Sequence, residues 1–183
     1  MLLLALLLGM LSGLNAVAAP NNAAHPPTAG EYTVKAAFLY HFAKFVEWPV
    51  ATRSSELTIC IVGVDPFGAT LDTITGKQVG TAQVSVQRLQ KLSKTVHCHI
   101  VFISTSEQSR LDSILSDTRD AMILTISEIP GFAEKGGMVL FHMEDSKVRF
   151  SINLTAMRSA QLTASGHLLR LARQVYQNEE DNP

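Results

Sequence analysis

Residue types that commonly bind metals or carry out catalysis are sparse in this chain. The clearest metal-like group is the run His97-Cys98-His99, which stands just before an apolar stretch typical of a strand. Alternate side chains of a strand point to opposite faces, so the two histidines would share one face. Such a pair could bind zinc or copper, with His142 or Met143 as a third ligand. The alternative is a polar position where a strand begins. We favour it and expect neither a metal nor another cofactor.

A second candidate is the turn V-G-V-D-P-F-G at 62–68, which contains Asp65. It follows a predicted strand and opens a predicted helix, which is the place where phosphates bind in nucleotide-binding folds. It matches neither the G-x-G-x-x-G nor the Walker A pattern. Two interpretations stay open: an anionic ligand held by exposed amides, or a plain connection, which we favour.

A third candidate is the polar face of the segment 147–153, where Arg149, Ser151 and Asn153 alternate with apolar residues. This face could simply meet solvent. It could also form a wall of a small ligand pocket, so we keep Asp65, Arg149 and Asn153 as possible pocket residues. Asn153 has a further possible role as the cap of the next helical turn.

No catalytic constellation is recognisable. The chain has neither a G-x-S-x-G elbow nor an H-E-x-x-H motif. The acidic pairs Glu144-Asp145 and Glu179-Glu180 fall in a predicted turn and a polar tail, whereas carboxylates used as acid and base lie in pockets. We therefore expect a protein that is not an enzyme.

The start of the chain indicates export. Residues 1–19 combine an apolar run, too short for a stable membrane span, with the small residues of a signal-peptidase site. Residues 20–30 are polar and rich in proline, so we expect a flexible arm, then a domain over 31–177 and a polar tail at 178–183. Lys plus Arg is 15 and Asp plus Glu is 16, a balance that gives no indication of nucleic-acid binding.

Export changes the interpretation of the two cysteines, Cys60 and Cys98. In an oxidising compartment a lone pair is a candidate disulfide, and both cysteines stand in strand-like segments. The bond would stabilise the fold by roughly 4 kcal/mol in the chain-entropy model. Two buried free thiols are the alternative.

The elements that must position these residues alternate between strands and helices. Continuous apolar runs at 57–63, 99–104 and 121–127 are typical of strands buried on both faces. Short helical patterns between them predict a parallel sheet. Two further strands around Glu144-Asp145-Ser146 predict a hairpin, and 166–176 predicts a closing helix. The predicted fold is a single α/β domain with a mainly parallel central sheet, a C-terminal β-hairpin and flanking helices.

Several stretches together resemble the YfiR-like family. The resemblance runs over roughly residues 31–175 and is strongest in the opening helix, Y-T-V-K-A-A-F-L-Y-H-F-A-K-F-V-E-W-P, and in the closing block from V-R-F-S-I-N to L-L-R-L-A. It also includes C-I-V-G-V-D-P-F-G, C-H-I-V-F-I-S and G-F-A-E-K-G-G-M-V-L-F. Many relatives carry a second cysteine pair near Phe132-Ala133 and Leu140-Phe141, where this chain has none.

The resemblance implies a periplasmic regulator that often forms dimers. Such a protein represses an inner-membrane diguanylate cyclase by binding its periplasmic sensory part, and thereby lowers cyclic di-GMP and biofilm formation. An outer-membrane lipoprotein can sequester the repressor. A small-ligand sensor or carrier in the periplasm is the alternative function.

The opening segment 31–49 holds six of the twelve aromatic side chains and predicts a helix that Pro49 ends. Apolar residues cover two of its faces. One face would pack on the sheet. The other would be a partner or dimer surface, or the closing helix would cover it within the same chain. The residues assigned to that surface are Tyr32, Leu39, Phe42, Val46 and Trp48.

Overall fold

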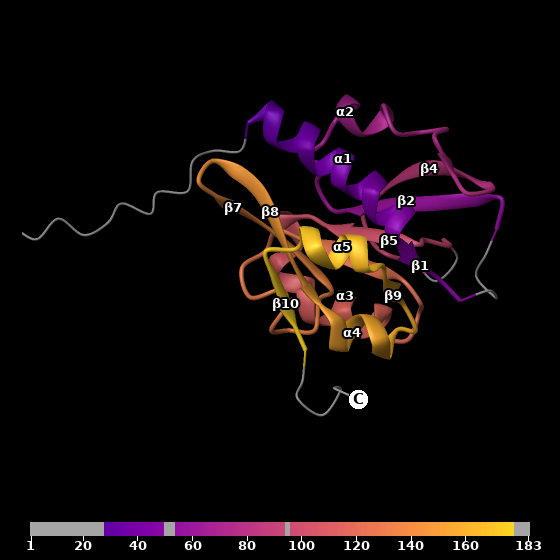
Figure 1. Cartoon of the computed structure of the whole chain (residues 1–183). Coiled ribbons are helices and arrows are strands. Elements are labelled where there is room, and N and C mark those ends of the chain that lie inside the picture. Colours follow the sequence, from indigo (N-terminus) through magenta and orange to yellow (C-terminus); the bar gives the residue numbers. More distant parts are fainter. Residues whose placement is uncertain (1–27, 50–53, 94–95, 178–183) are drawn as a thin grey trace, which may run out of the picture.

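The computed structural model describes residues 28–49, 54–93 and 96–177. The predicted signal peptide, most of the predicted arm and the polar tail lie outside the described residues. The predicted α/β fold is confirmed: helices lie on both faces of a mainly parallel sheet, with α1 and α3 on opposite sides (Figure 1).

The main sheet has eight strands in the order β10-β8-β7-β6-β5-β2-β4-β3. Antiparallel pairing is confined to β3 with β4 and to the predicted hairpin of β7 with β8; the other neighbours are parallel. The strands are β2 (Glu56–Val62), β3 (Gln78–Val79), β4 (Ala82–Leu89), β5 (Ile100–Ile103), β6 (Leu124–Ser127), β7 (Val139–Glu144), β8 (Lys147–Asn153) and β10 (Gln174–Tyr176). A separate small sheet joins β1 (Val46–Glu47) to β9 (Thr163–Ala164).

Helices cover the two faces of this sheet unequally. Alternate side chains of β2 and β5 divide between two apolar cores, so that Ile59 faces the larger one and Val62 the smaller one. The larger core is closed by α1 (Ala29–Phe45), α2 (Ala69–Asp72), α4 (Leu154–Ser159) and α5 (Gly166–Leu171). The smaller core is closed by α3 (Leu111–Thr118), which continues from the 3-10 helix η2 (Thr105–Arg110).

The opening helix is shorter than the sequence predicted. It begins after Thr28, whose hydroxyl accepts a hydrogen bond from the Glu31 amide, and it ends at Phe45, four residues before Pro49. Val46 is already extended because it pairs with Ala164 in the small sheet. Strand pairing therefore ends the helix before the proline.

The prediction of one closing helix over 166–176 was wrong in its second half. Ser165 caps α5, which ends at Leu171, and the chain then joins the sheet as β10, parallel to β8. Val175 pairs with Ile152 in that sheet. The apolar spacing of Leu168, Leu171 and Val175 is compatible with a helix, but the open edge of β8 offers backbone hydrogen bonds that such a pattern does not record.

Candidate functional site

A buried cluster of charges ties the start of α1 to the end of β6. The side chain of Lys35 is 2% exposed, and its ammonium forms ion pairs with Glu31 one turn earlier and with Glu128 just after β6. Tyr32 donates a hydrogen bond from its hydroxyl to Glu128 Oε1 at 2.9 Å. The Lys35 ammonium also lies 4.6 Å from the centroid of the Tyr32 ring. This cluster fixes the position of α1 on the carboxyl edge of the sheet.

Burial dominates the electrostatics of this cluster. Removal of the phenol from water, followed by its hydrogen bond to Glu128, raises the pKa of Tyr32 well above its usual range. Tyr32 therefore stays a neutral hydrogen-bond donor, and Lys35 compensates the two carboxylates. The sequence analysis missed Lys35 and Glu128. The sequence does contain one indication of this cluster. Lys35 is a charged residue on a face of the predicted helix whose other side chains are apolar.

The residues predicted to form a partner surface are mostly internal. Leu39 and Phe42 are fully buried, and Tyr32 and Val46 are also in the core. The Phe42 ring lies 5.1 Å from that of Phe150 and 5.8 Å from that of Phe141. The prediction that this face of α1 binds a partner is therefore wrong for these residues. The alternative holds in part: α5, the first half of the predicted closing helix, covers α1 within the chain together with α2 and the sheet.

A different face of α1 is exposed. Val34 is 43% exposed, Ala37 and His41 are also exposed, and Phe38 and Phe45 are half-buried beside them. We call these five residues the outer stripe. Lys44 lies along one flank of the stripe, and Phe45 on the other flank contacts His167 of α5, with ring centroids 4.8 Å apart. The outer stripe itself contains no Asp, Glu, Lys or Arg.

The carboxyl edge of the sheet is where ligands bind in open α/β folds, at the point where the strand order reverses. Here that point lies between β2 and β5, since the chain goes from β2 to β4 on one side and then to β5 on the other. Gly63 has a φ of +92°, and a Cβ there would collide with Ser106 and Glu107. Ser106 Oγ accepts a hydrogen bond from the Val64 amide at 3.0 Å. The protein's own side chains therefore fill this crevice.

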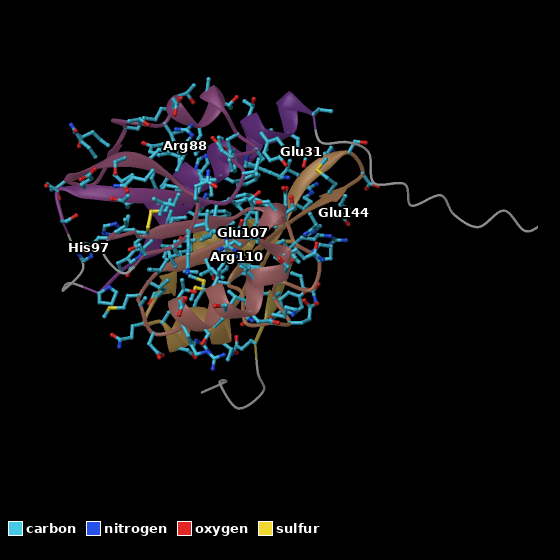
Figure 2. The ribbon with its side chains drawn as sticks, turned by 180° about the vertical axis from the view of Figure 1, so that it is seen from behind. Glu31, Arg88, His97, Glu107, Arg110 and Glu144 are labelled. Atoms are coloured by element: carbon cyan, nitrogen blue, oxygen red, sulfur yellow. A yellow bond between two sulfur atoms is a disulfide. The ribbon has the colours of Figure 1, made fainter. Side chains whose placement is uncertain are left out.

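Salt bridges reinforce the filled crevice. Glu107 is buried and pairs with Arg110, which also donates to the Gln90 carbonyl at 3.2 Å (Figure 2). Beside it, Arg88 donates to Asp65 Oδ2 at 2.6 Å and to Asp72 Oδ1 at 2.8 Å. These two hydrogen bonds raise the pKa of Arg88.

The three predicted pocket residues do not meet. Asp65 follows β2, where its carboxylate accepts from the Phe67 amide at 2.7 Å and thus occupies the position proposed for an anion. Arg149 and Asn153 lie on β8, from which β7, β6 and β5 separate β2. Asn153 caps α4 by accepting from the Ala156 amide at 2.9 Å, as one interpretation predicted. A shared pocket of these residues is therefore not formed.

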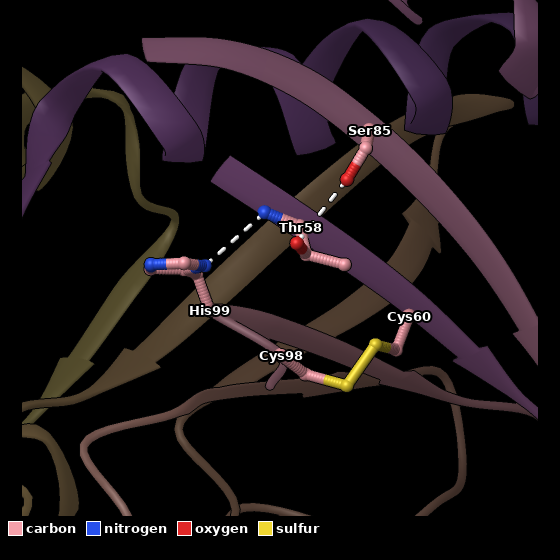
Figure 3. Close-up of a disulfide and its surroundings, with 5 residues drawn as sticks. All are labelled: Thr58, Cys60, Ser85, Cys98 and His99. Carbon is pink, nitrogen blue, oxygen red and sulfur yellow. Dashed lines mark hydrogen bonds between the residues drawn. A yellow bond between two sulfur atoms is a disulfide. The ribbon is translucent and has the colours of Figure 1, made fainter. Parts of the chain in front are cut away.

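The predicted disulfide is confirmed. Cys60 on β2 is bonded to Cys98 just before β5, as Figure 3 shows. The neighbouring His99 accepts a hydrogen bond at Nδ1 from the Thr58 amide at 3.1 Å, so this nitrogen holds two strands together. His142 stands on β7, across β6 from β5. Within the described ranges no three His, Cys, Asp or Glu side chains gather as metal ligands.

A cavity of about 430 Å³ lies at the amino edge of the sheet beside Trp48. Its lining includes Val46, Leu57 and Val79 together with the polar side chains of Ser54 and His99. Trp48 Nε1 is buried and has no hydrogen-bond partner among the residues that the structure describes. A buried indole N–H usually has one, so we regard this cavity as a candidate site for a small ligand.

A comparison with known protein families identifies the family of this chain. The model of the family described as YfiR/HmsC-like matches residues 32–173. The chain belongs to the YfiR/HmsC-like family. No curated protein matches it. The match extends from Tyr32 to the end of the segment that leads into β10, so the YfiR/HmsC-like region contains Tyr32, Lys35 and Glu128 of the buried cluster, the outer stripe and the disulfide.

The described part of this YfiR/HmsC-like chain contains no helix that is both long enough and apolar enough to cross a membrane. The predicted signal peptide lies outside that part.

Proposed function

We propose that this protein is a periplasmic negative regulator. It binds the periplasmic sensory part of an inner-membrane diguanylate cyclase and so lowers cyclic di-GMP signalling and biofilm formation. The observation that carries the proposal is membership of the YfiR/HmsC-like family over residues 32–173. The predicted signal peptide supports the location.

Two features of the site support regulation by protein contact. The crevice where an α/β enzyme would hold its substrate is filled by Ser106 and Glu107. The outer stripe of α1 instead presents Val34, Ala37 and His41 to the solvent. A helix face that combines exposed apolar side chains with half-buried aromatic rings is a candidate protein interaction site.

The mechanism we propose is differential affinity. A repressor shifts a cyclase toward its inactive state only if it binds that state more tightly. A preference of about 1.4 kcal/mol gives a tenfold shift, and a shift from almost fully active to almost fully inactive requires about 5.5 kcal/mol. We include in the proposal a homodimer and an outer-membrane lipoprotein that releases the cyclase by sequestering the repressor.

The direct test is a strain that lacks this gene. We expect cyclic di-GMP, measured by mass spectrometry, to rise when the gene is deleted and to fall when it is restored. Unchanged levels in a strain whose periplasm-facing cyclases are expressed would contradict the proposal.

A small-ligand sensor is the second candidate, because Trp48 lines a cavity of about 430 Å³ and its buried indole N–H has no hydrogen-bond partner among the described residues. A ligand that binds only the folded state raises the melting temperature. Screening of amino acids, nucleotides and metal ions by thermal shift checks this function. A hit that the Trp48→Phe variant also shows would exclude the indole N–H as the binding group.

A further inference from the structure

The outer stripe of α1 is more specific than a generic apolar patch. This inference rests on the proposed function, since it names the surface and the kind of partner that the regulator uses. Apart from Thr33, the exposed positions of α1 follow the series Gly30, Val34, Ala37, His41 and Lys44, at alternating spacings of four and three residues. That alternation places these residues along one face of α1, and we call this face the seam; it is the face that a second helix would contact if it packed lengthwise on α1.

The middle of the seam consists of small and medium-sized side chains bordered by two aromatic rings. Ala37 stands at its centre and leaves room for a partner's larger side chain, while Val34 and His41 lie one turn away on either side. Phe38 and Phe45 border it as half-buried rings. A partner element that lies along this stripe must therefore offer an apolar face of its own.

One flank of the stripe is positively charged. The ammonium of Lys44 lies 5.5 Å from the centroid of the Tyr40 ring, and that of Lys77, in the turn before β3, lies 5.3 Å from it. Both lysines are exposed, and neither forms an ion pair with any described residue. The other flank, at Phe45 and His167, contains aromatic rings instead.

We propose that the outer stripe binds an amphipathic helix of the partner, one that carries an apolar face and acidic residues along one edge. The apolar face lies on Val34, Ala37 and His41, and the acidic edge meets Lys44 and Lys77. Opposite charges across such an edge set the orientation of the partner and speed its association.

Charge also argues against a second copy of this chain on the same stripe. A twofold contact pairs a surface patch with itself. In an antiparallel pairing of two α1 helices the same flank of each copy would meet, and this flank of α1 carries Thr33, Ala37, Tyr40 and Lys44 but no acidic side chain. Such a contact leaves the lysines without a counter-charge, whereas an acidic helix neutralises them.

Photo-cross-linking in cells that express the full chain tests this proposal. The probe is p-benzoylphenylalanine in place of Ala37, and the control carries it in place of Ser116, which is exposed on α3. The linked peptides are sequenced by mass spectrometry. We expect the probe at 37 to link a periplasmic segment with apolar residues at helical spacing and at least two acidic residues on one edge. A link to α1 of a second copy, a link to a neutral or basic segment, or no link beyond the control would overturn the proposal.

The role of the positively charged flank is tested by reversing the charge of its two lysines. We expect the double variant Lys44→Glu with Lys77→Glu to lower the cross-link yield at least about tenfold, equivalent to about 1.4 kcal/mol. The matched control, Lys91→Glu with Lys147→Glu, makes the same change of net charge at other exposed positions. Equal yields from the two variants, at equal melting temperatures, would contradict the role of the lysines.

The outcome separates this inference from the proposed function. An acidic amphipathic helix that belongs to a protein other than a cyclase supports the surface and overturns the assigned target. Unchanged cyclic di-GMP in the deletion strain overturns the function without bearing on what the stripe binds.

Discussion

Lys35 is the residue that explains how an almost wholly apolar helix takes one fixed position. Apolar packing alone is non-directional, so several rotations of α1 could bury similar areas. Glu31 lies on α1 itself and turns with it, so the ion pair of the Lys35 ammonium with Glu128, just after β6, is the contact that selects the rotation of the helix. The cluster thus determines which face of α1 becomes the outer stripe.

We expect Lys35→Met to lower the free energy of unfolding by about 3 kcal/mol, because it leaves two partly buried carboxylates without their cation. Urea unfolding followed by circular dichroism measures the loss. Lys91→Met, at an exposed position, should change stability by less than about 0.5 kcal/mol. Equal effects of the two substitutions would show that the cluster does not hold α1.

Tyr32 gives the cluster a dependence on alkaline pH. Its pKa is raised in the folded protein above the ordinary value of 10.0, so folding favours the neutral phenol. This contribution is complete below about pH 10 and is lost, by roughly 1.4 kcal/mol per pH unit, as the pH rises toward the folded pKa. Tyr32→Phe should therefore flatten the fall in stability above pH 10. An identical alkaline slope in wild type and variant would contradict this assignment.

The disulfide is the second single feature that we expect to stabilise the fold strongly. Cys60 and Cys98 are 38 residues apart, for which the chain-entropy model predicts a stabilisation of roughly 4 kcal/mol. We expect the double substitution Cys60→Ala with Cys98→Ala to lower stability by about that amount in urea unfolding. A reductant should lower the melting temperature of the wild type and leave the double variant unchanged. Sensitivity of both proteins to the reductant would point to another cause.

At the scale of elements, α1 has one face in the core and another in the solvent. Its inner face packs Leu39 and Phe42 into the core, and its outer stripe leaves Val34 and Ala37 in water. The concentration of aromatic residues in this helix therefore serves mainly the interior, where their rings contact β7 and β8.

Substitutions on the two faces should separate stability from binding. We expect Leu39→Ala to cost about 2–5 kcal/mol, because a fully buried leucine leaves a cavity. Val34→Ala should cost less than about 0.5 kcal/mol, since that side chain is largely exposed. Thermal and urea unfolding of the two variants provide the measurement. A large loss for Val34→Ala would mean that the outer stripe is needed for folding.

Periodicity predicted the parallel strands and the hairpin because buried strands are long, apolar and bounded by turns. It failed at 172–176, where a helical pattern became β10 through pairing with β8. It also failed to assign the faces of α1, since a helix that is apolar almost all round does not show which face packs on the sheet. Lys35 identifies that face in the structure, but its partner Glu128 is 93 residues away in the sequence.

The candidate site was predictable only in part for the same reason. The disulfide followed from cysteine number and the expected compartment, and the cap at Asn153 followed from local spacing. The filled crevice depends on Gly63 and Glu107, which meet only through the order of the strands. The cavity beside Trp48 likewise forms between segments that are distant in sequence.

At the scale of the whole molecule, the fold combines a filled crevice at the carboxyl edge of the sheet with an exposed face on α1, its longest described helix. The disulfide joins β2 to the start of β5, and the buried ion cluster joins α1 to the end of β6. Under the function that we propose, the outer stripe of α1 is the surface that binds the cyclase.

The most direct test compares cyclic di-GMP in a deletion strain that expresses either of two variants at equal level. Ala37→Glu places a charge in the centre of the outer stripe, and Ser116→Glu places one on the exposed side of α3. We predict that Ser116→Glu restores low cyclic di-GMP and that Ala37→Glu, equally stable, leaves it at the level of the deletion strain. Full repression by Ala37→Glu would contradict the account.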